Sequence, residues 1–482
     1  MAWHESYRTR VLERGYQFAE KHLHHHFLDA LTAHLDTVAK LPLFANAAAQ
    51  DDIRALRTSL VELHDVTFPP QAPEVPDYFY AIQTELERRH GDVAGIGRTG
   101  LSRNDLDMAV YKLAARAQLL ATGEDILRLR EHVLALAEKH TSTVLIAYTH
   151  HQPGQPITVA HYLVAVLHML ERTSERLIQG LARLDSSPLG AAALAGSSHP
   201  LDREFTAGQL GFAGPTLNTY EAVSSSDWQY DLIAVTDALA LDMSRFVTDL
   251  ILWSERGWFR LADGLVQGSS IMPQKRNPVT LEHARTAFSR ALGYTGVIRI
   301  SSHNIPLGDL NDFGPDLQEA LVLQRTELDA ALTLLSAACE LGDFVPAALE
   351  KVAAETDTTA TELADVLVRD YGLTFPEAHH IVQVLVTQKQ AASEVFPSLT
   401  PAEVVHAGGP ELSAEALHDA IAPKAFVARR NGIGGPAEEA VATQLIHIQK
   451  QLSRDTLQLH KNRDSANAAI TQLRNPRSEG RK

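Results

Sequence analysis

The sequence predicts a mainly α-helical protein with a long central helix bundle. Apolar side chains recur every three or four residues over long stretches, whereas alternating strand patterns are scarce. The chain has 482 residues, too many for one ordinary core, so two or three subdomains are expected. Long helices with aligned apolar stripes pack as bundles.

Four stretches predict the bundle helices: residues 159–184, 228–253, 280–297 and 321–341. The third and fourth are shorter but keep the helical spacing. The clearest apolar stripe lies in the second stretch and consists of Trp228, Leu232, Val235, Leu239, Met243, Phe246, Leu250 and Trp253. Further apolar residues beside this stripe indicate that the helix packs on several neighbours. We interpret its Met and aromatic side chains as core residues.

Proline and glycine divide the chain. We expect a helix to stop in residues 68–76, a glycine-bearing loop at 95–104 and a connection at 188–200. After residue 357 the helices shorten, which predicts a smaller C-terminal domain. The predicted division is an N-terminal helical domain of residues 1–104, a central long-helix domain of residues 105–356, and a smaller C-terminal helical domain of residues 357–482.

Composition excludes several classes of partner. The chain has 43 Lys and Arg against 59 Asp and Glu, a net charge of −16, which disfavours nucleic acid because phosphate binding needs basic surface. The single cysteine, Cys339, excludes an intrachain disulfide, and its apolar flank predicts a buried position. The N-terminus has no apolar signal core, and no apolar run is long enough to span a bilayer. We therefore expect a soluble cytoplasmic protein.

The segment GSSIMPQKRNP at residues 268–278 is the most informative in the chain. Its glycine and prolines shape the backbone. Ser269, Ser270, Lys275 and Asn277 can all hydrogen-bond to an oxyanion, and the two apolar residues between them can dock the loop on a scaffold. This combination predicts a loop for an anionic, oxygen-rich ligand; a purely structural turn is the alternative.

A second candidate is YTHHQPGQP at residues 148–156, which carries Thr149, His150, His151 and Gln152 just before a predicted long helix. A helix N-terminus favours anions, and histidine moves protons near neutral pH. Surface histidines without function are the alternative.

A third candidate is GIGRTGLSRND at residues 95–105. Arg103 can grip a carboxylate through two hydrogen bonds, and Asn104 can add a third. Alternatively, Ser102 or Asn104 only caps a helix in a solvated turn.

Together these segments resemble the argininosuccinate lyase branch of the fumarase/aspartase superfamily. GSSIMPQKRNP is similar to the superfamily signature, whereas TGLSRND, YTHHQPGQPITVAHYL and PLGAAALAGSSHPLDREF are similar to the branch. The matches run in one order from about residue 97 to residue 444, and the first ninety residues are much less alike. The resemblance implies a three-domain subunit, a homotetramer with a twenty-helix core, and active sites that draw segments from three chains.

The resemblance also implies the reaction, a reversible β-elimination that releases fumarate from a succinyl compound. By resemblance, Ser269 is the general base, and Lys275 and Asn277 bind the carboxylate whose negative charge grows. His150 is the acid or proton relay to the leaving nitrogen, and Glu282 orients this histidine.

Other positions match the family's binding residues. Ser102, Arg103, Asn104 and Thr149 match residues that bind the succinyl carboxylates, and Gln152 is a plausible neighbour. The resemblance implies a small dicarboxylate substrate and no metal or organic cofactor.

Departures from the family concern the amine end of the substrate. The sequence has Arg98 and Leu101 where argininosuccinate lyases usually have histidine and arginine. The family's PLAYNKDLQEDK, whose tyrosine, glutamine and lysine hold the amino-acid end, has become PLGDLNDFGPDLQEA. Asp309 stands in place of the tyrosine, Gln318 matches the glutamine only if the loop gained residues, and the lysine has no clear equivalent.

The resulting prediction is a carbon–nitrogen lyase that releases fumarate from an N-substituted aspartate, with argininosuccinate as the default substrate. Three alternatives stay open at this point: a lyase of the same mechanism for another N-succinyl amine, a non-catalytic crystallin-like homologue, and a sister enzyme such as aspartase, fumarase or adenylosuccinate lyase. The intact candidate residues argue against the second, and the branch-specific C-terminal matches against the third.

Overall fold

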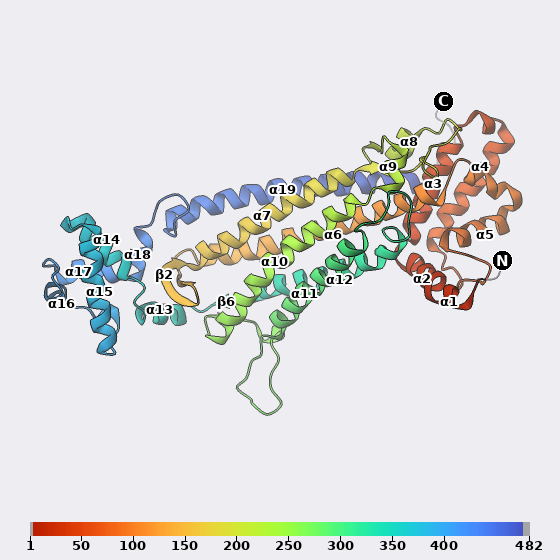
Figure 1. The fold of residues 1–482 in the computed structure, drawn as a ribbon. Helices are drawn as coiled ribbons and strands as arrows, with labels where there is room; N and C mark the ends of the chain where they lie inside the picture. Colours follow the sequence, from red (N-terminus) through yellow and green to blue (C-terminus); the bar gives the residue numbers. More distant parts are fainter. Residues whose placement is uncertain (1–2, 476–482) are drawn as a thin grey trace.

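A computed structural model describes residues 3–475. Long helices form an elongated bundle, with the N-terminal helices gathered at one end and a group of short C-terminal helices at the other (Figure 1). The N-terminal elements are α1 (Glu5–Tyr7), a π-helical turn η1 (Arg8–Leu12), α2 (Glu13–His22), α3 (His24–Val38), η2 (Pro42–Phe44), α4 (Ala47–Glu62), η3 (Leu63–Asp65), α5 (Tyr78–His90) and η4 (Gly91–Arg98).

Five long helices build the central bundle: α6 (Arg103–Lys139), α7 (Val159–Leu184), α10 (Asp227–Glu255), α11 (Val279–Ser301) and α12 (Pro315–Leu341). The four helices predicted from apolar spacing are confirmed, and α7 has the predicted bounds. All eight side chains of the α10 stripe are buried, as their spacing predicted. Cys339 on α12 is also buried, and burial raises the pKa of its thiol to about 12.

Helix α6 sets the length of the bundle. Ser102 caps its N-terminus: its Oγ accepts from the backbone N–H of Asn104 at 3.3 Å, and its own N–H donates to Asp105 at 3.0 Å. The helix has 37 residues and therefore spans about 55 Å at ~1.5 Å per residue. Segments that precede and follow α6 thus lie at opposite ends of the bundle.

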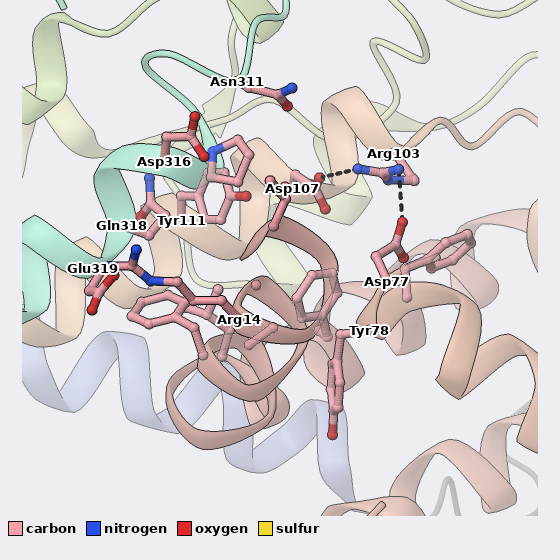
Figure 2. A pocket seen from close by; sticks show the side chains of 18 of the residues that line it. Arg14, Asp77, Tyr78, Arg103, Asp107, Tyr111, Asn311, Asp316, Gln318 and Glu319 are labelled. Atoms are coloured by element: carbon pink, nitrogen blue, oxygen red, sulfur yellow. Dashed lines mark hydrogen bonds and ion pairs between the residues drawn. The ribbon is translucent and has the colours of Figure 1, made fainter. Parts of the chain in front are cut away.

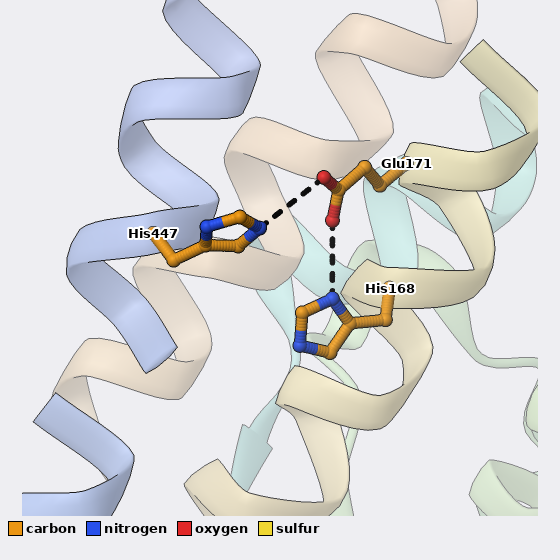
Figure 3. Close-up of side chains that lie close together, drawn as sticks. All are labelled: His168, Glu171 and His447. Carbon is orange, nitrogen blue, oxygen red and sulfur yellow. Dashed lines mark hydrogen bonds and ion pairs between the residues drawn. The ribbon is translucent and has the colours of Figure 1, made fainter. Parts of the chain in front are cut away.

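The last described helix, α19 (Glu438–Arg474), returns along α6 and α7 (Figure 1). Arg130 on α6 pairs with Asp455 on α19 at 2.7 Å, and both side chains are buried. Glu171 on α7 lies between two histidines, His168 at 3.0 Å and His447 of α19 at 3.4 Å (Figure 3). These contacts fix α19 against the bundle.

Short C-terminal helices form a second apolar cluster, built from residues between 363 and 421. Its elements are α14 (Ala360–Tyr371), α15 (Phe375–Ala391), η6 (Phe396–Ser398), α16 (Pro401–His406) and α17 (Ala414–Ile421), followed by α18 (Pro423–Ala428). The larger cluster includes both the N-terminal and central helices, and also α19. The predicted division at residues 104 and 356 stays a prediction.

Strands are few and short, as expected. The described residues form three two-stranded sheets: β1 (Val144–Thr149) antiparallel to β2 (Gln152–Thr158), β3 (Ser186–Ser187) parallel to β4 (Gly214–Pro215), and β5 (Phe259–Arg260) antiparallel to β6 (Asp343–Phe344). The remaining short helices are α8 (Arg203–Gln209), α9 (Thr219–Ser224), η5 (Asp263–Leu265) and α13 (Pro346–Ala354).

The expectation of a loop at residues 95–104 was wrong in its first half. Residues up to Arg98 continue the 3₁₀ helix η4, and only residues 99–102 form the loop that enters α6. Across residues 3–475, the long helices carry too many polar residues for any of them to qualify as a membrane span.

Candidate active site

The predicted site residues lie in three places. Ser102, Arg103 and Asn104 stand at the start of α6, close to the N-terminal helices. Their backbone is held by Asp105, whose carboxylate also accepts from the N–H groups of Gly190 at 2.8 Å and Ala192 at 2.9 Å. The amide of Asn104 donates to the carbonyl of Ala193 at 3.0 Å. The 188–200 connection therefore positions this group.

Arg103 already faces carboxylates of its own chain. Its guanidinium lies 2.8 Å from Asp77, the N-cap residue of α5, and 3.7 Å from Asp107, one helical turn further along α6 (Figure 2). Burial raises the pKa of Asp107 to about 7, although the charge of Arg103 opposes this shift. Burial also raises the pKa of Asp77 against the same opposing charge. The sequence prediction for Arg103 did not include these two carboxylates.

The second group, Thr149 to Gln152, forms the tip of the β1–β2 hairpin. His150 and His151 are its two turn residues, with φ of 52° and 61°, a combination typical of a type I′ turn. The prediction that this group directly precedes a helix was wrong, because β2 separates it from α7. Both histidines adopt a backbone conformation that costs a non-glycine residue about 1–2 kcal/mol, and such strain gathers at functional sites.

The third group belongs to the loop between η5 and α11, which projects from the bundle (Figure 1). Paired backbone hydrogen bonds between Gln267 and Asn277, at 3.0 and 2.9 Å, close its base. Ser269 Oγ accepts from the N–H of Met272 at 3.1 Å. Lys275 is exposed and makes no ion pair with any residue of the range 3–475.

Part of the loop prediction did not hold. The sequence led us to expect that Ile271 and Met272 dock the loop on a scaffold, but Ile271 is 84% exposed. Glu282 follows the loop in the first turn of α11 and is also exposed. Within one chain the loop therefore offers its reactive groups to the outside.

The three groups cannot meet within one chain. The 37 residues of α6 separate Ser102 from the hairpin with His150 by about 55 Å at ~1.5 Å per residue. Ser269 precedes α11, whereas Asp309, whose charge interacts with Arg103, lies in the connection that follows α11. The 23 residues of α11 therefore separate Ser269 from the surroundings of Arg103. Among the described residues, no hydrogen bond or ion pair joins one group to another.

A cavity of about 450 Å³ opens beside Arg103, between the N-terminal helices and the start of α12 (Figure 2). Gln318 lines it together with Arg103, so the structure brings these two predicted residues together. Asp107 and Tyr111 also line it and were missed by the sequence reasoning. A signal for both was available, because they follow Arg103 at intervals of four residues and share its face of α6.

Within residues 3–475, one cluster of side chains could hold a metal ion. His168, Glu171 and His447 each offer one donor atom, and these atoms lie within 4.8 Å of one another (Figure 3). The cluster lies on the α7–α19 contact, apart from the three predicted site groups. The spacing of His168 and Glu171, one helical turn apart, was visible in the sequence, but their approach to His447 was not.

Comparisons with known proteins agree on one family. The family described as Lyase matches residues 80–293, and the family described as Argininosuccinate lyase C-terminal matches residues 357–428. The chain is 34% identical to an argininosuccinate lyase of Methanoculleus marisnigri over 457 residues, which cover 92% of this chain and 90% of that protein. It is 32% identical to an argininosuccinate lyase of Hyphomonas neptunium over 425 residues, 87% of this chain and 90% of that one.

A solved structure has the same fold. An EDDS lyase variant with bound fumarate superposes with a TM-score of 0.85 at 28% sequence identity, and the match covers 94% of this chain and 91% of that chain.

Proposed function

The chain belongs to the argininosuccinate lyase branch of the fumarase/aspartase superfamily and is a carbon–nitrogen lyase, and we propose that it releases fumarate from an N-substituted aspartate, with argininosuccinate as the default substrate. The observation that carries this proposal is the geometry of the Ser269 loop. Asn277 belongs to the closed base, and the loop above it carries half-buried Ser269 and exposed Lys275, whose ammonium makes no ion pair within residues 3–475.

The proposed chemistry follows from these groups. Ser269 removes a proton from the carbon next to a carboxylate, and the N–H of Met272 that already points at Oγ favours its charged form. Lys275 and Asn277 stabilise the doubly charged carboxylate that results. The C–N bond then breaks, the nitrogen gains a proton, and fumarate and the free amine leave.

The hairpin and the start of α6 supply the remaining roles. We propose that His150 delivers the proton to the leaving nitrogen and that Glu282 orients it. Ser102, Arg103, Asn104, Thr149, Gln152 and Ser270 hold the succinyl carboxylates, and Gln318 holds the amine end.

We further propose a homotetramer whose sites combine groups from different subunits. The separation of the three groups supports this arrangement, since a single chain cannot bring them together. Apolar side chains exposed on the long bundle helices, such as Leu241, Ile300 and Leu341, offer surface for other subunits. A solution mass near four times the 52.7 kDa of one chain would support the tetramer. A cytoplasmic location stays a prediction based on the single cysteine.

Fumarate absorbance provides the test. The protein should release fumarate from argininosuccinate or from another member of a panel of N-succinyl amines. Ser269→Ala should lower the rate by about 10²–10⁴-fold, the usual contribution of a general base. Ser453→Ala, which removes an exposed hydroxyl on α19, is the matched control and should keep the rate. Release that is unaffected by Ser269→Ala would refute the base assignment, and no release from any adduct would favour the non-catalytic alternative.

A further inference from the structure

The cavity beside Arg103 has an inner wall of polar side chains with unused hydrogen-bonding capacity (Figure 2). Tyr111 is only 5% exposed, and its hydroxyl forms no hydrogen bond with any described residue. Gln318 is 4% exposed; its amide N–H donates to the carbonyl of Gly314 at 2.9 Å, which leaves its carbonyl oxygen without a partner in residues 3–475. Neither oxygen is among the fully buried unpartnered atoms of residues 3–475, so both remain accessible from the cavity and can accept from a ligand there.

Asp107 completes this wall. Its only ion pair within the described range joins it to Arg103 at 3.7 Å, beyond ordinary hydrogen-bond length. Asp107, Tyr111 and Gln318 together present three oxygen acceptors to the same cavity. An ammonium group carries three N–H donors and no acceptor, so it suits such a wall.

The charge of the cavity also favours a cation. Two carboxyl groups, Asp77 and Asp107, face the single positive charge of Arg103. Burial raises the pKa of both, and a bound cation would favour their charged forms. Asp309 adds a third negative charge, close enough to act on Arg103. At the rim, Arg10 and Arg14 are balanced by Asp316 and Glu319, so this part adds no net charge. A carboxylate at the inner wall would be repelled.

We propose that Asp107, Tyr111 and Gln318 bind the leaving amine, and that this amine carries a second cationic nitrogen, an ammonium or guanidinium, and no amino-acid carboxylate, so its succinyl adduct replaces argininosuccinate as the preferred substrate. The inference rests on the proposed function, because it assigns the end of the substrate opposite the succinyl group. The guanidinium of Arg103 and the carboxylate of Asp107 lie only 3.7 Å apart. This short spacing favours a short diamine or a short aminoalkyl guanidine over a long one.

The reverse reaction tests the amine class directly. Fumarate is offered with three amines of similar length: 1,4-diaminobutane, 1-aminopentane and 4-aminobutanoate. Adducts are identified by mass, and kcat/KM is taken from the loss of fumarate absorbance. The diamine should be preferred over the uncharged amine by roughly 10- to 100-fold, the range expected for hydrogen bonds to a charged group. The carboxylate-bearing amine should be the poorest.

Two variants test the assigned residues. Asp107→Asn should raise KM for the diamine and remove its advantage over 1-aminopentane, with little change for the latter. Tyr111→Phe keeps the ring and should weaken the preference for the diamine over 1-aminopentane. It provides a second test of the binding wall if Asp107→Asn folds poorly. Asp92→Asn, at an exposed aspartate of η4, is the matched control and should leave the preference unchanged.

The outcomes distinguish this inference from the proposed function. A preference for 4-aminobutanoate, or a diamine preference that survives in Asp107→Asn, would overturn the amine assignment while fumarate chemistry still holds. Efficient turnover of argininosuccinate without any use of diamines would do the same. Absence of both adduct formation and fumarate release would remove the proposed function and the inference with it.

Discussion

Mixed tetramers offer the sharpest test of a shared site, because the structure separates its parts by a known helix. Asn104 lies at the start of α6, and His150 lies in the hairpin that follows the end of this helix. Asn104 is the second residue of the 37-residue helix α6, which therefore holds the two side chains roughly 50 Å apart at ~1.5 Å per residue. If both act on one substrate, they come from different subunits.

The perturbation is a pair of inactive variants, Asn104→Ala and His150→Ala. Each alone should retain about 1% of the rate or less, since loss of one anion-binding donor or one proton relay costs about 10²–10⁴-fold. In randomly mixed tetramers, a site is intact when its Asn104 and its His150 both come from subunits that carry them. Each condition holds for half of the subunits, so about a quarter of the sites should be intact in a symmetric assembly.

The assay is fumarate release by hybrids made through co-expression of two differently tagged chains, purified on both tags in succession. Purification on both tags removes the parental homotetramers, about one eighth of a random mixture, so activity of roughly 30% of the wild-type value is expected. The matched control combines Asn104→Ala with Ser102→Ala, which lie in one segment of the same chain. No site can then receive both native residues, so this mixture should stay inactive.

Hybrids of Asn104→Ala and His150→Ala that stay as inactive as their parents would refute the reasoning. Recovery of activity in the Asn104→Ala and Ser102→Ala control would refute it as well, since that result would mean that the two residues serve different sites.

Three further predictions concern stability. Gly100→Ala should lower the free energy of unfolding, measured in urea, by about 1–2 kcal/mol, because φ at this position is 70° and an added Cβ would lie 2.9 Å from a serine hydroxyl. The control is Gly97→Ala, which has open space around it and should change the free energy of unfolding by roughly 0.5 kcal/mol or less. Asp455→Ala should lower the free energy of unfolding by about 3–5 kcal/mol, because it removes the ion-pair partner of the fully buried Arg130 guanidinium. Asp464→Ala breaks an exposed ion pair and should cost about 1 kcal/mol or less. Equal losses would contradict the packing of α19. Burial lowers the pKa of His34 to about 4, so the unfolded chain binds the proton at a higher pH than the folded chain does. Stability should therefore fall as pH drops from about 6.5 towards 4. His34→Gln should flatten this part of the plot of unfolding midpoint against pH, and an unchanged plot would contradict the prediction.

The α10 stripe shows how far sequence reasoning reached. Its eight apolar residues recur with the helical period, so both the helix and its buried face could be predicted from neighbours in the chain. The same holds for the bounds of α7, and the Ser269 loop was identified by its unusual residue content.

Tertiary structure decided the rest. The expectation that Thr149 to Gln152 directly precede the long helix failed because β2 pairs with β1, and this pairing forces two histidines into a tight turn. Asp107 looked like an ordinary polar residue of a helix until packing placed it beside Asp77 and the α11–α12 connection. The sequence alone determined the helices, the family and the reactive residue types, because periodicity and motifs are local properties of the chain. Only the tertiary structure decided which of these residues meet, since contacts between distant segments depend on how long helices pack and how far apart they hold their ends.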